Sequence, residues 1–179
     1  MTLLDRLWTL ADDIADSMRS DGALLFGECG LILVRPLKRW EYSCTPINTL
    51  TFATTGGDGV HYGLLQFPGF THDEQPIVMT VPMATEYNTV VAESLKEFLG
   101  LGYFVGWFSL EQLAYDASEA VSYFSQPDSD SWPEKEEELS LLRDAIGINY
   151  SVLLVERIQD LKEKYHSLLR FPESVTPGG

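Results

Sequence analysis

A glycine-rich stretch near the middle of the chain, residues 51–65 (TFATTGGDGVHYGLL), constrains the fold more than any other feature. The runs on either side of its glycines alternate with a period of two residues, which is typical of β-strands. Between these runs, Gly56, Gly57 and Gly59 can supply the positive φ angles that a tight turn needs, and Asp-Gly is a preferred turn pair. The sequence therefore predicts a β-hairpin with Asp58 facing water at its tip.

The same glycines do not fit two well-known nucleotide-binding loops. A phosphate-binding loop of the Walker type requires a lysine followed by Ser or Thr, and an acid stands here in place of the lysine. The dinucleotide-binding fingerprint requires a third glycine where Tyr62 stands, and it requires a helix where a strand follows. A hairpin turn is therefore the better interpretation of this loop.

Other periodicities extend the picture beyond the hairpin. Residues 76–82 (PIVMTVP) are apolar and bounded by prolines, as suits a central strand, so we expect an antiparallel meander over residues 49–82. Residues 31–34 have the composition of another buried strand, stopped by Arg35-Pro36. Because helices and strands do not alternate, the sequence predicts an α+β fold with an N-terminal helix and later helices packed on the sheet. Helical spacing of apolar residues covers residues 2–19, 88–100, 109–124, 134–146 and 151–169.

The length of 179 residues suits one domain with a helical appendage. We expect an α+β domain over residues 1–124, followed by a polar, breaker-rich mobile loop over residues 125–133. Residues 134–179 should form C-terminal helices packed on the same domain. Trp132 stands out within the polar loop, and we expect it either to pack back on the domain or to anchor a partner.

The chain carries 27 acidic and 12 basic residues, which give a net charge of −15. Such a field repels phosphate backbones, so we expect no nucleic acid partner, and it attracts a basic protein. Solubility alone is the simpler alternative. The acids concentrate in residues 61–125, where Lys96 is the only Lys or Arg, and on one face they would form a docking surface. These acids are Asp73, Glu74, Glu86, Glu93, Glu97, Glu111, Asp116 and Glu119.

Several absences favour a cytoplasmic protein without cofactors. The N-terminus (MTLLDR) lacks a basic region ahead of an apolar core, and no apolar run is long enough to span a membrane. Cys29 and Cys44 are expected as free thiols in a reducing compartment, with a disulfide as the less favoured alternative. The three histidines are scattered and no Cys-x-x-Cys pair is present, so we expect no metal site.

His61 offers a catalytic alternative. It follows Asp58 by three residues, and a carboxylate can orient a histidine to act as a general base. Strand alternation places His61 opposite Val60 and Tyr62, on a face that we expect to be solvated. A small hydrolase or ligand-binding enzyme that uses His61 and Asp58 is therefore the second interpretation, and a structural subunit of an oligomer is the third.

Several short motifs resemble the SMI1/KNR4, or SUKH, superfamily. They are residues 45–48 (TPIN), the hairpin at 51–65, residues 76–82 and residues 91–99 (VAESLKEFL). Domains of that superfamily show a similar order of a helix, an antiparallel sheet with a Phe-Ala-x-x-Gly-Gly-Asp-Gly hairpin, a strand carrying Pro-Ile-Val, and a helix ending in Glu-Phe-Leu. The Trp-Glu-Tyr stretch before residue 45 and the helices after residue 109 depart from the family pattern.

This resemblance implies a protein-binding module rather than an enzyme. Many bacterial members are immunity proteins that block a polymorphic toxin, often a nuclease, and an acidic inhibitor can occupy the basic surface that a nuclease needs. We therefore expect a non-enzymatic cytoplasmic protein, a monomer or weak homo-oligomer, that binds a basic partner such as a toxin domain. The residues expected to bind this partner are Asp58, Tyr62, Asp73, Glu74, Glu86, Glu93 and Glu97.

Overall fold

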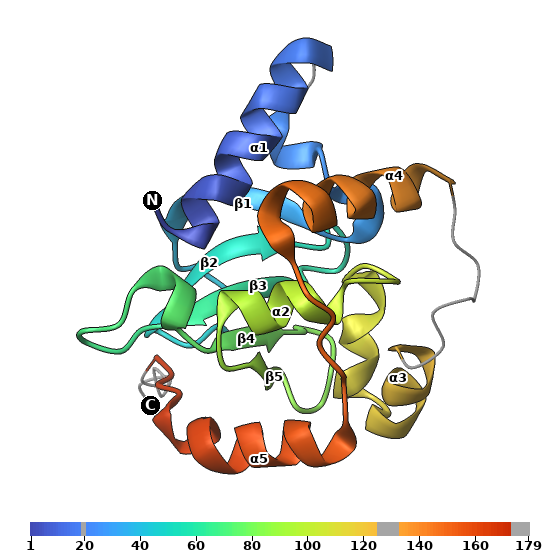
Figure 1. Cartoon of the computed structure of the whole chain (residues 1–179). Coiled ribbons are helices and arrows are strands. Elements are labelled where there is room, and N and C mark those ends of the chain that lie inside the picture. The colour runs from blue at the N-terminus through green and yellow to red at the C-terminus, as the bar shows by residue number, and fades with distance from the viewer. Residues whose placement is uncertain (19–20, 125–132, 173–179) are drawn as a thin grey trace.

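The computed structural model describes residues 1–18, 21–124 and 133–172, and its centre is a five-stranded antiparallel sheet (Figure 1). The strands lie side by side in sequence order, so the sheet is a meander, and the meander predicted for residues 49–82 is confirmed. The α+β fold class is confirmed as well. The strands are β1 (Ile32–Lys38), β2 (Thr49–Thr54), β3 (His61–Leu65), β4 (Ile77–Thr80) and β5 (Asn88–Ala92).

The helices surround this sheet. In Figure 1, α1 and α4 lie at one end of the molecule and α5 lies at the other end, next to β5. Within the described residues, no helix is long and apolar enough to cross a membrane. The α-helices are α1 (Leu3–Met18), α2 (Leu95–Leu101), α3 (Ala117–Phe124), α4 (Pro133–Leu142) and α5 (Val155–Tyr165). Shorter turns are η1 (Gly22–Leu24), η2 (Gly27–Cys29), η3 (His72–Glu74), η4 (Phe108–Ala114), the π-helical η5 (Arg143–Gly147) and η6 (His166–Leu168).

One face of the sheet packs an aromatic core against α2. The ring of Phe98 lies 5.5 Å from that of Phe52 and 4.8 Å from that of Tyr62, measured between centroids. Trp107 packs against the same phenylalanine, and its indole N–H donates to the Phe98 carbonyl at 2.9 Å. All four side chains are buried, so this face fixes both α2 and the chain that follows it.

The opposite face carries a buried polar row across four strands. The strand register places Thr54, His61, Thr80 and Asn88 side by side. Thr80 Oγ1 donates to Asn88 Oδ1 at 2.8 Å, and Asn88 Nδ2 donates to the Cys44 carbonyl at 2.9 Å. Because buried polar groups require hydrogen-bond partners, this row ties the irregular segment 39–48 to the sheet.

Two predicted elements, the helix over residues 88–100 and the strand over residues 31–34, have different bounds in the structure. Residues 88–92 form strand β5 rather than the start of a helix, because Thr89, Val90 and Val91 are β-branched and can pair with β4. The helix begins later, where Ser94 Oγ accepts the Glu97 N–H at 3.1 Å. Strand β1 also continues through Pro36, which an edge strand with an irregular register tolerates.

The C-terminal half contains more breaks than the periodicity predicted. The helix expected over residues 109–124 divides into η4 and α3, and the Asp116 carboxylate caps α3 by accepting the N–H groups of Ser118 and Glu119. The last helix begins at Val155, after a stretch without helix or strand over residues 148–154. Residues 125–132 of the predicted loop, including Trp132, lie outside the described residues.

Candidate binding surfaces

The hairpin tip has the predicted form. Gly56 and Gly59 adopt φ angles of 84° and 73°, and Asp58 adopts a φ of 49° while its side chain is exposed. The Val60 N–H donates to the Gly57 carbonyl at 3.0 Å and closes the turn. The geometry therefore bends the chain through its glycines and leaves the Asp58 carboxylate in water.

The turn η4 spaces two of its side chains so that they share one face. Phe108 and Glu111 are three residues apart, and side chains at that spacing eclipse one another on a 3₁₀-helix. Phe108 is 52% exposed and Glu111 is partly buried. Burial raises the pKa of Glu111, and the charge of Asp58 raises it further. The two carboxylates are therefore electrostatic neighbours.

The backbone beneath η4 is tightly fixed. Gly30 has a φ of 75°, and a Cβ at this position would lie 2.5 Å from the Phe108 nitrogen. The Trp107 N–H donates to the Cys29 carbonyl at 2.6 Å, which joins η4 to η2. On the other side of the tip, the hydroxyl of the half-exposed Tyr42 lies against Gly59. We call Tyr42, Asp58, Phe108 and Glu111 the hairpin-end surface.

Tyr62 does not belong to any surface, so its prediction as a partner-binding residue was wrong. Its side chain is fully buried, and its hydroxyl donates to the Trp107 carbonyl at 2.8 Å. Burial strongly raises the pKa of this phenol. Alternation along β3 correctly separated Tyr62 from His61, but the helical layer that covers the Tyr62 side comes from residues far along the chain. Tyr62 supports η4 from below instead of meeting a partner.

His61 is also buried, contrary to the expectation of a solvated face, with 1% of its surface exposed. Its Nδ1 lies 2.7 Å from the Gly59 carbonyl, which can only accept, so Nδ1 carries a proton. Its Nε2 lies 3.1 Å from Thr45 Oγ1, and Trp40 and Tyr42 flank the ring. Burial lowers the pKa of His61. The imidazole is oriented by Gly59, not by Asp58 as the catalytic alternative supposed.

Two of the predicted acids serve as helix caps. Asp73 accepts the N–H groups of Leu3 at 2.6 Å and Leu4 at 3.2 Å, so it caps α1 across 70 residues of sequence. Glu74 accepts the N–H of Thr71 at 2.9 Å and its hydroxyl at 2.8 Å, and these bonds lower the pKa of Glu74. Both carboxylates are therefore tied to the backbone of their own chain.

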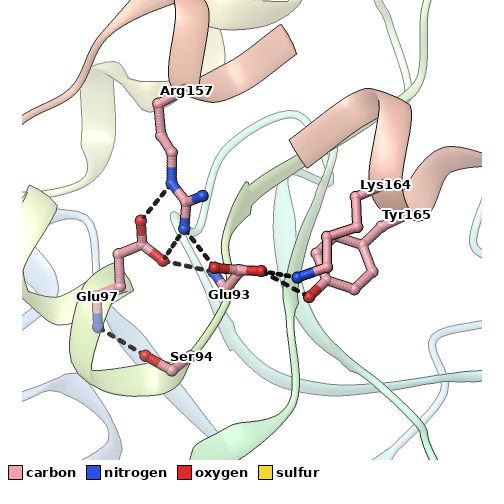
Figure 2. A network of polar contacts seen from close by, with 6 residues as sticks. All are labelled: Glu93, Ser94, Glu97, Arg157, Lys164 and Tyr165. Carbon is pink, nitrogen blue, oxygen red and sulfur yellow. Dashed lines mark hydrogen bonds and ion pairs between the residues drawn. The ribbon is translucent and has the colours of Figure 1, made fainter. Parts of the chain in front are cut away.

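The acids next to β5 meet cations of α5, as Figure 2 shows. Arg157 Nε lies 2.9 Å from Glu97 Oε1, and Arg157 Nη2 lies 2.7 Å from Glu93 Oε2. Lys164 pairs with Glu93 as well, and the Tyr165 hydroxyl donates to Glu93 Oε1 at 2.8 Å. Two carboxylates are thus balanced by two cations. We call Glu93, Glu97, Arg157, Lys164 and Tyr165 the α5 clamp.

The protonation states of the clamp follow from these contacts. Hydrogen bonds from Arg157, then from Lys164 and Tyr165, lower the pKa of Glu93 to about 2. The carboxylates of Glu97 and Glu93 in turn raise the pKa of Arg157. A further pair extends the contact, because Lys162 Nζ lies 2.5 Å from Glu86 Oε2. Both partners of that pair are at least half exposed, so it stabilises little.

The structure therefore divides the predicted partner-binding residues among separate places. Asp58 is at the hairpin-end surface, whereas Glu86, Glu93 and Glu97 lie under α5. Sequence reasoning did not select Phe108 and Glu111 as a pair, because it placed Phe108 ahead of the helix expected over residues 109–124. It also missed the cations of α5, although three of the 12 Lys and Arg residues, Arg157, Lys162 and Lys164, fall within eight positions.

Cys29 and Cys44 are free, buried thiols, and burial raises the pKa of both. Within the part of the chain that the structure describes, no group of three or more His, Cys, Asp or Glu side chains could hold a metal ion. No family model, curated protein or solved structure matches this chain.

Proposed function

We propose that this chain is a non-enzymatic, cytoplasmic protein-binding module that docks a cationic protein on its hairpin-end surface. One observation carries the proposal: the charge of the exposed Asp58 adds to burial in raising the pKa of Glu111, and within the described residues neither acid forms an ion pair. Like charges held together oppose folding unless another group compensates them, and such groups are frequently functional.

A cationic partner would supply that compensation. A Lys or Arg side chain placed between the two carboxylates would be attracted by both, and the surrounding negative field would speed its approach. Phe108, three residues before Glu111 in η4, and Tyr42, whose ring lies against Gly59, add exposed aromatic surface. Aromatic side chains are enriched among the residues that contribute most to protein interfaces, so acid and aromatic groups together suit a protein better than a free ion.

The resemblance to the SMI1/KNR4 superfamily supports the same class of function and suggests a kind of partner. The residues that carry the resemblance include the hairpin that builds this surface. Many members of that superfamily block toxins, so we propose an immunity protein whose partner is a basic toxin domain, such as a nuclease. Occupying the basic, substrate-binding surface of such a domain would neutralise it without any chemistry by the inhibitor.

The proposal is tested with the protein encoded by the neighbouring gene. We expect the two proteins to co-purify, and we expect the toxin activity to be lost in the complex. Asp58→Lys/Glu111→Lys should weaken binding at least tenfold and reduce its salt dependence. Asp13→Lys/Asp144→Lys, which changes net charge equally at two exposed acids elsewhere, is the matched control. Undiminished binding by the first variant would overturn the assignment of the surface, and no complex with any basic neighbour would overturn the function.

A further inference from the structure

A tight turn over residues 67–70 (FPGF) brings two phenylalanine rings together at the surface. The Phe70 N–H donates to the Phe67 carbonyl at 3.3 Å. Pro68 is followed by Gly69, whose φ of 86° is the positive value that a type II turn needs at its third residue. The centroids of the two rings lie 6.0 Å apart, with their planes tilted by 55°. Phe70 is nevertheless 56% exposed, so the turn presents aromatic surface to solvent.

A buried glutamine holds this turn from inside the protein. Gln75 is 2% exposed, and its side-chain oxygen accepts the Phe67 N–H at 2.8 Å. Its Nε2 donates to the carbonyls of Phe67 at 3.1 Å and of Phe70 at 3.2 Å. A buried amide requires hydrogen-bond partners, and these three bonds all go to the backbone of the turn. The two rings are therefore held in place in advance, as a preorganised binding site requires.

The turn and the end of α5 line a cavity of about 470 Å³, which is within the size range of small-molecule sites. The centroid of the Tyr165 ring lies 6.1 Å from that of Phe67, with the planes tilted by 54°, so three rings line adjoining walls. Two acids and one base give the lining a net negative charge. The other lining residues are Phe70, Glu74, Pro76, Glu93, Lys164 and Leu168.

The α5 wall of this cavity is fixed where the helix ends. Asn48 Nδ2 donates to the Leu168 carbonyl at 3.0 Å, and the Arg170 N–H donates to Asn48 Oδ1 at 3.0 Å. The Ile47 N–H donates to the Arg170 carbonyl at 2.7 Å, and the Leu169 side chain is buried. The cavity is therefore a permanent feature between two anchored walls, and its occupation requires no movement of α5.

Helix α5 itself shows how this cavity attracts an ammonium group. Lys164 Nζ lies 5.0 Å from the centroid of the Tyr165 ring and pairs with Glu93 (Figure 2). A cation over an aromatic ring and beside a carboxylate is attracted by both groups. The chain thus uses a ring and an acid together to hold a positive charge at the α5 side of the cavity.

The turn side of the cavity carries the same two kinds of group. Glu74 is exposed and lines the cavity together with the rings of Phe67 and Phe70. Its Oε2 accepts two hydrogen bonds from Thr71, whereas within the described residues no hydrogen bond or ion pair reaches its Oε1. This side therefore offers rings and a carboxylate to a cation that the described part of the chain does not supply.

We propose that the cavity between residues 67–70 and α5 binds a small quaternary ammonium compound. Its trimethylammonium group lies against the rings of Phe67 and Phe70, and Glu74 supplies the opposing charge. A quaternary group suits this cavity better than a primary ammonium, because its methyl groups contact apolar walls and it has no N–H donors to satisfy. This site is separate from the hairpin-end surface, and neither proposal depends on the other.

The probes are choline and its neutral isostere, in which carbon replaces the quaternary nitrogen. Each is titrated into the full-length chain at constant salt, and amide chemical shifts are followed by NMR. We expect saturable shifts at residues 67–75 and 164–168 with choline, and about tenfold weaker binding of the isostere. Equal binding of the two compounds would reduce the site to an apolar cleft and overturn the proposal, as would the absence of saturable shifts in these residues.

Two variants assign the roles of ring and charge. Phe70→Leu keeps an apolar side chain but removes the ring, and it should weaken choline binding about tenfold while the isostere binds as before. Glu74→Gln keeps an oxygen that can accept from Thr71 but removes the charge, and it should also weaken choline selectively. Glu119→Gln makes the same change at an exposed acid of α3 and should have no effect. Equal losses in all three variants would overturn the assignment.

A last arm distinguishes a free compound from a protein side chain. A short peptide that carries trimethyllysine offers the same trimethylammonium group on a chain. We expect the peptide to bind no more tightly than choline, because the cavity is small and the recognised group is the same. A peptide that binds about tenfold more tightly would assign the cavity to a modified partner protein and overturn a small-molecule ligand.

Discussion

The hairpin-end surface and the α5 clamp are both built around pairs of carboxylates, yet their electrostatics are opposite. Two cations surround Glu93 and Glu97, and the pKa of Glu93 falls to about 2. At the hairpin end, burial and the charge of Asp58 raise the pKa of Glu111 instead. The same residue type therefore stabilises the fold in one region and opposes it in the other, and only the tertiary partners decide which.

The two regions also differ in what holds them. The platform of the hairpin-end surface rests on close backbone contacts between η4 and η2, which do not respond to salt. Helix α5 is held in part by ion pairs, which do respond to salt, and in part by the buried Ile158 and Leu161 and by hydrogen bonds between Asn48 and the residues after the helix. High salt should therefore loosen α5 while it leaves η4 unchanged.

The largest effect is expected at the platform. Gly30→Ala should destabilise the protein by about 3 kcal/mol, because the new methyl group would overlap the backbone of Phe108 and the position has a positive φ. Gly69→Ala is the matched control, since that glycine has a φ of 86° but open space around it, and about 1 kcal/mol is expected. Urea unfolding of both variants measures the difference, and equal losses would show that η4 is not locked on η2.

A smaller loss is expected at the clamp. Arg157→Ala should cost about 1–2 kcal/mol, because its pairs are more buried than surface pairs but less buried than core pairs. Lys162→Ala, which removes an exposed pair, should cost about 0.5 kcal/mol or less. Urea unfolding gives the energies, and hydrogen exchange should locate the Arg157→Ala loss in residues 155–165. A loss spread evenly over the sheet would contradict the view of α5 as a separately opening unit.

These two regions also show which features could be predicted from the sequence and which could not. The hairpin was predictable because Gly56, Asp58 and Gly59 set its backbone locally. Strand β5 was missed because Val90 and Val91 fit a helical face as well as a strand, and only pairing with β4 decides between them. Asp73 and Arg157 find their partners 70 and 60 or more residues away, and no local pattern encodes such contacts. Alternation separated His61 from Tyr62, but it did not show that both faces are covered.

Acid should release α5 before it unfolds the sheet. The pKa of Glu93 is lowered in the folded protein, so its contribution to stability is complete above its ordinary value of 4.5 and is lost as pH falls toward about 2. Hydrogen exchange of residues 155–165, followed from pH 7 to pH 3 and corrected for intrinsic rates, should show protection falling below pH 4.5. Glu93→Gln should start with less protection and lose little more. Parallel loss in α5 and in the sheet would contradict the prediction.

The smallest effect is expected at Glu111 and has the opposite sign. Because the pKa of Glu111 is raised in the folded protein, its ionised form opposes folding, and stability falls as pH rises through 4.5 toward the folded value. Glu111→Gln should therefore stabilise the protein at pH 7 by about 0.5 kcal/mol or less. At pH 3 we expect no gain, because the wild-type glutamate is protonated there and is as neutral as the glutamine that replaces it. Glu119→Gln, at an exposed acid of α3, is the control and should change the stability at neither pH.

The same Glu111→Gln variant should associate more slowly with a cationic partner, because the charge that opposes folding is the one that attracts the partner. A variant that is more stable at pH 7 and binds the partner as fast as the wild type would break the link between the uncompensated charge and function.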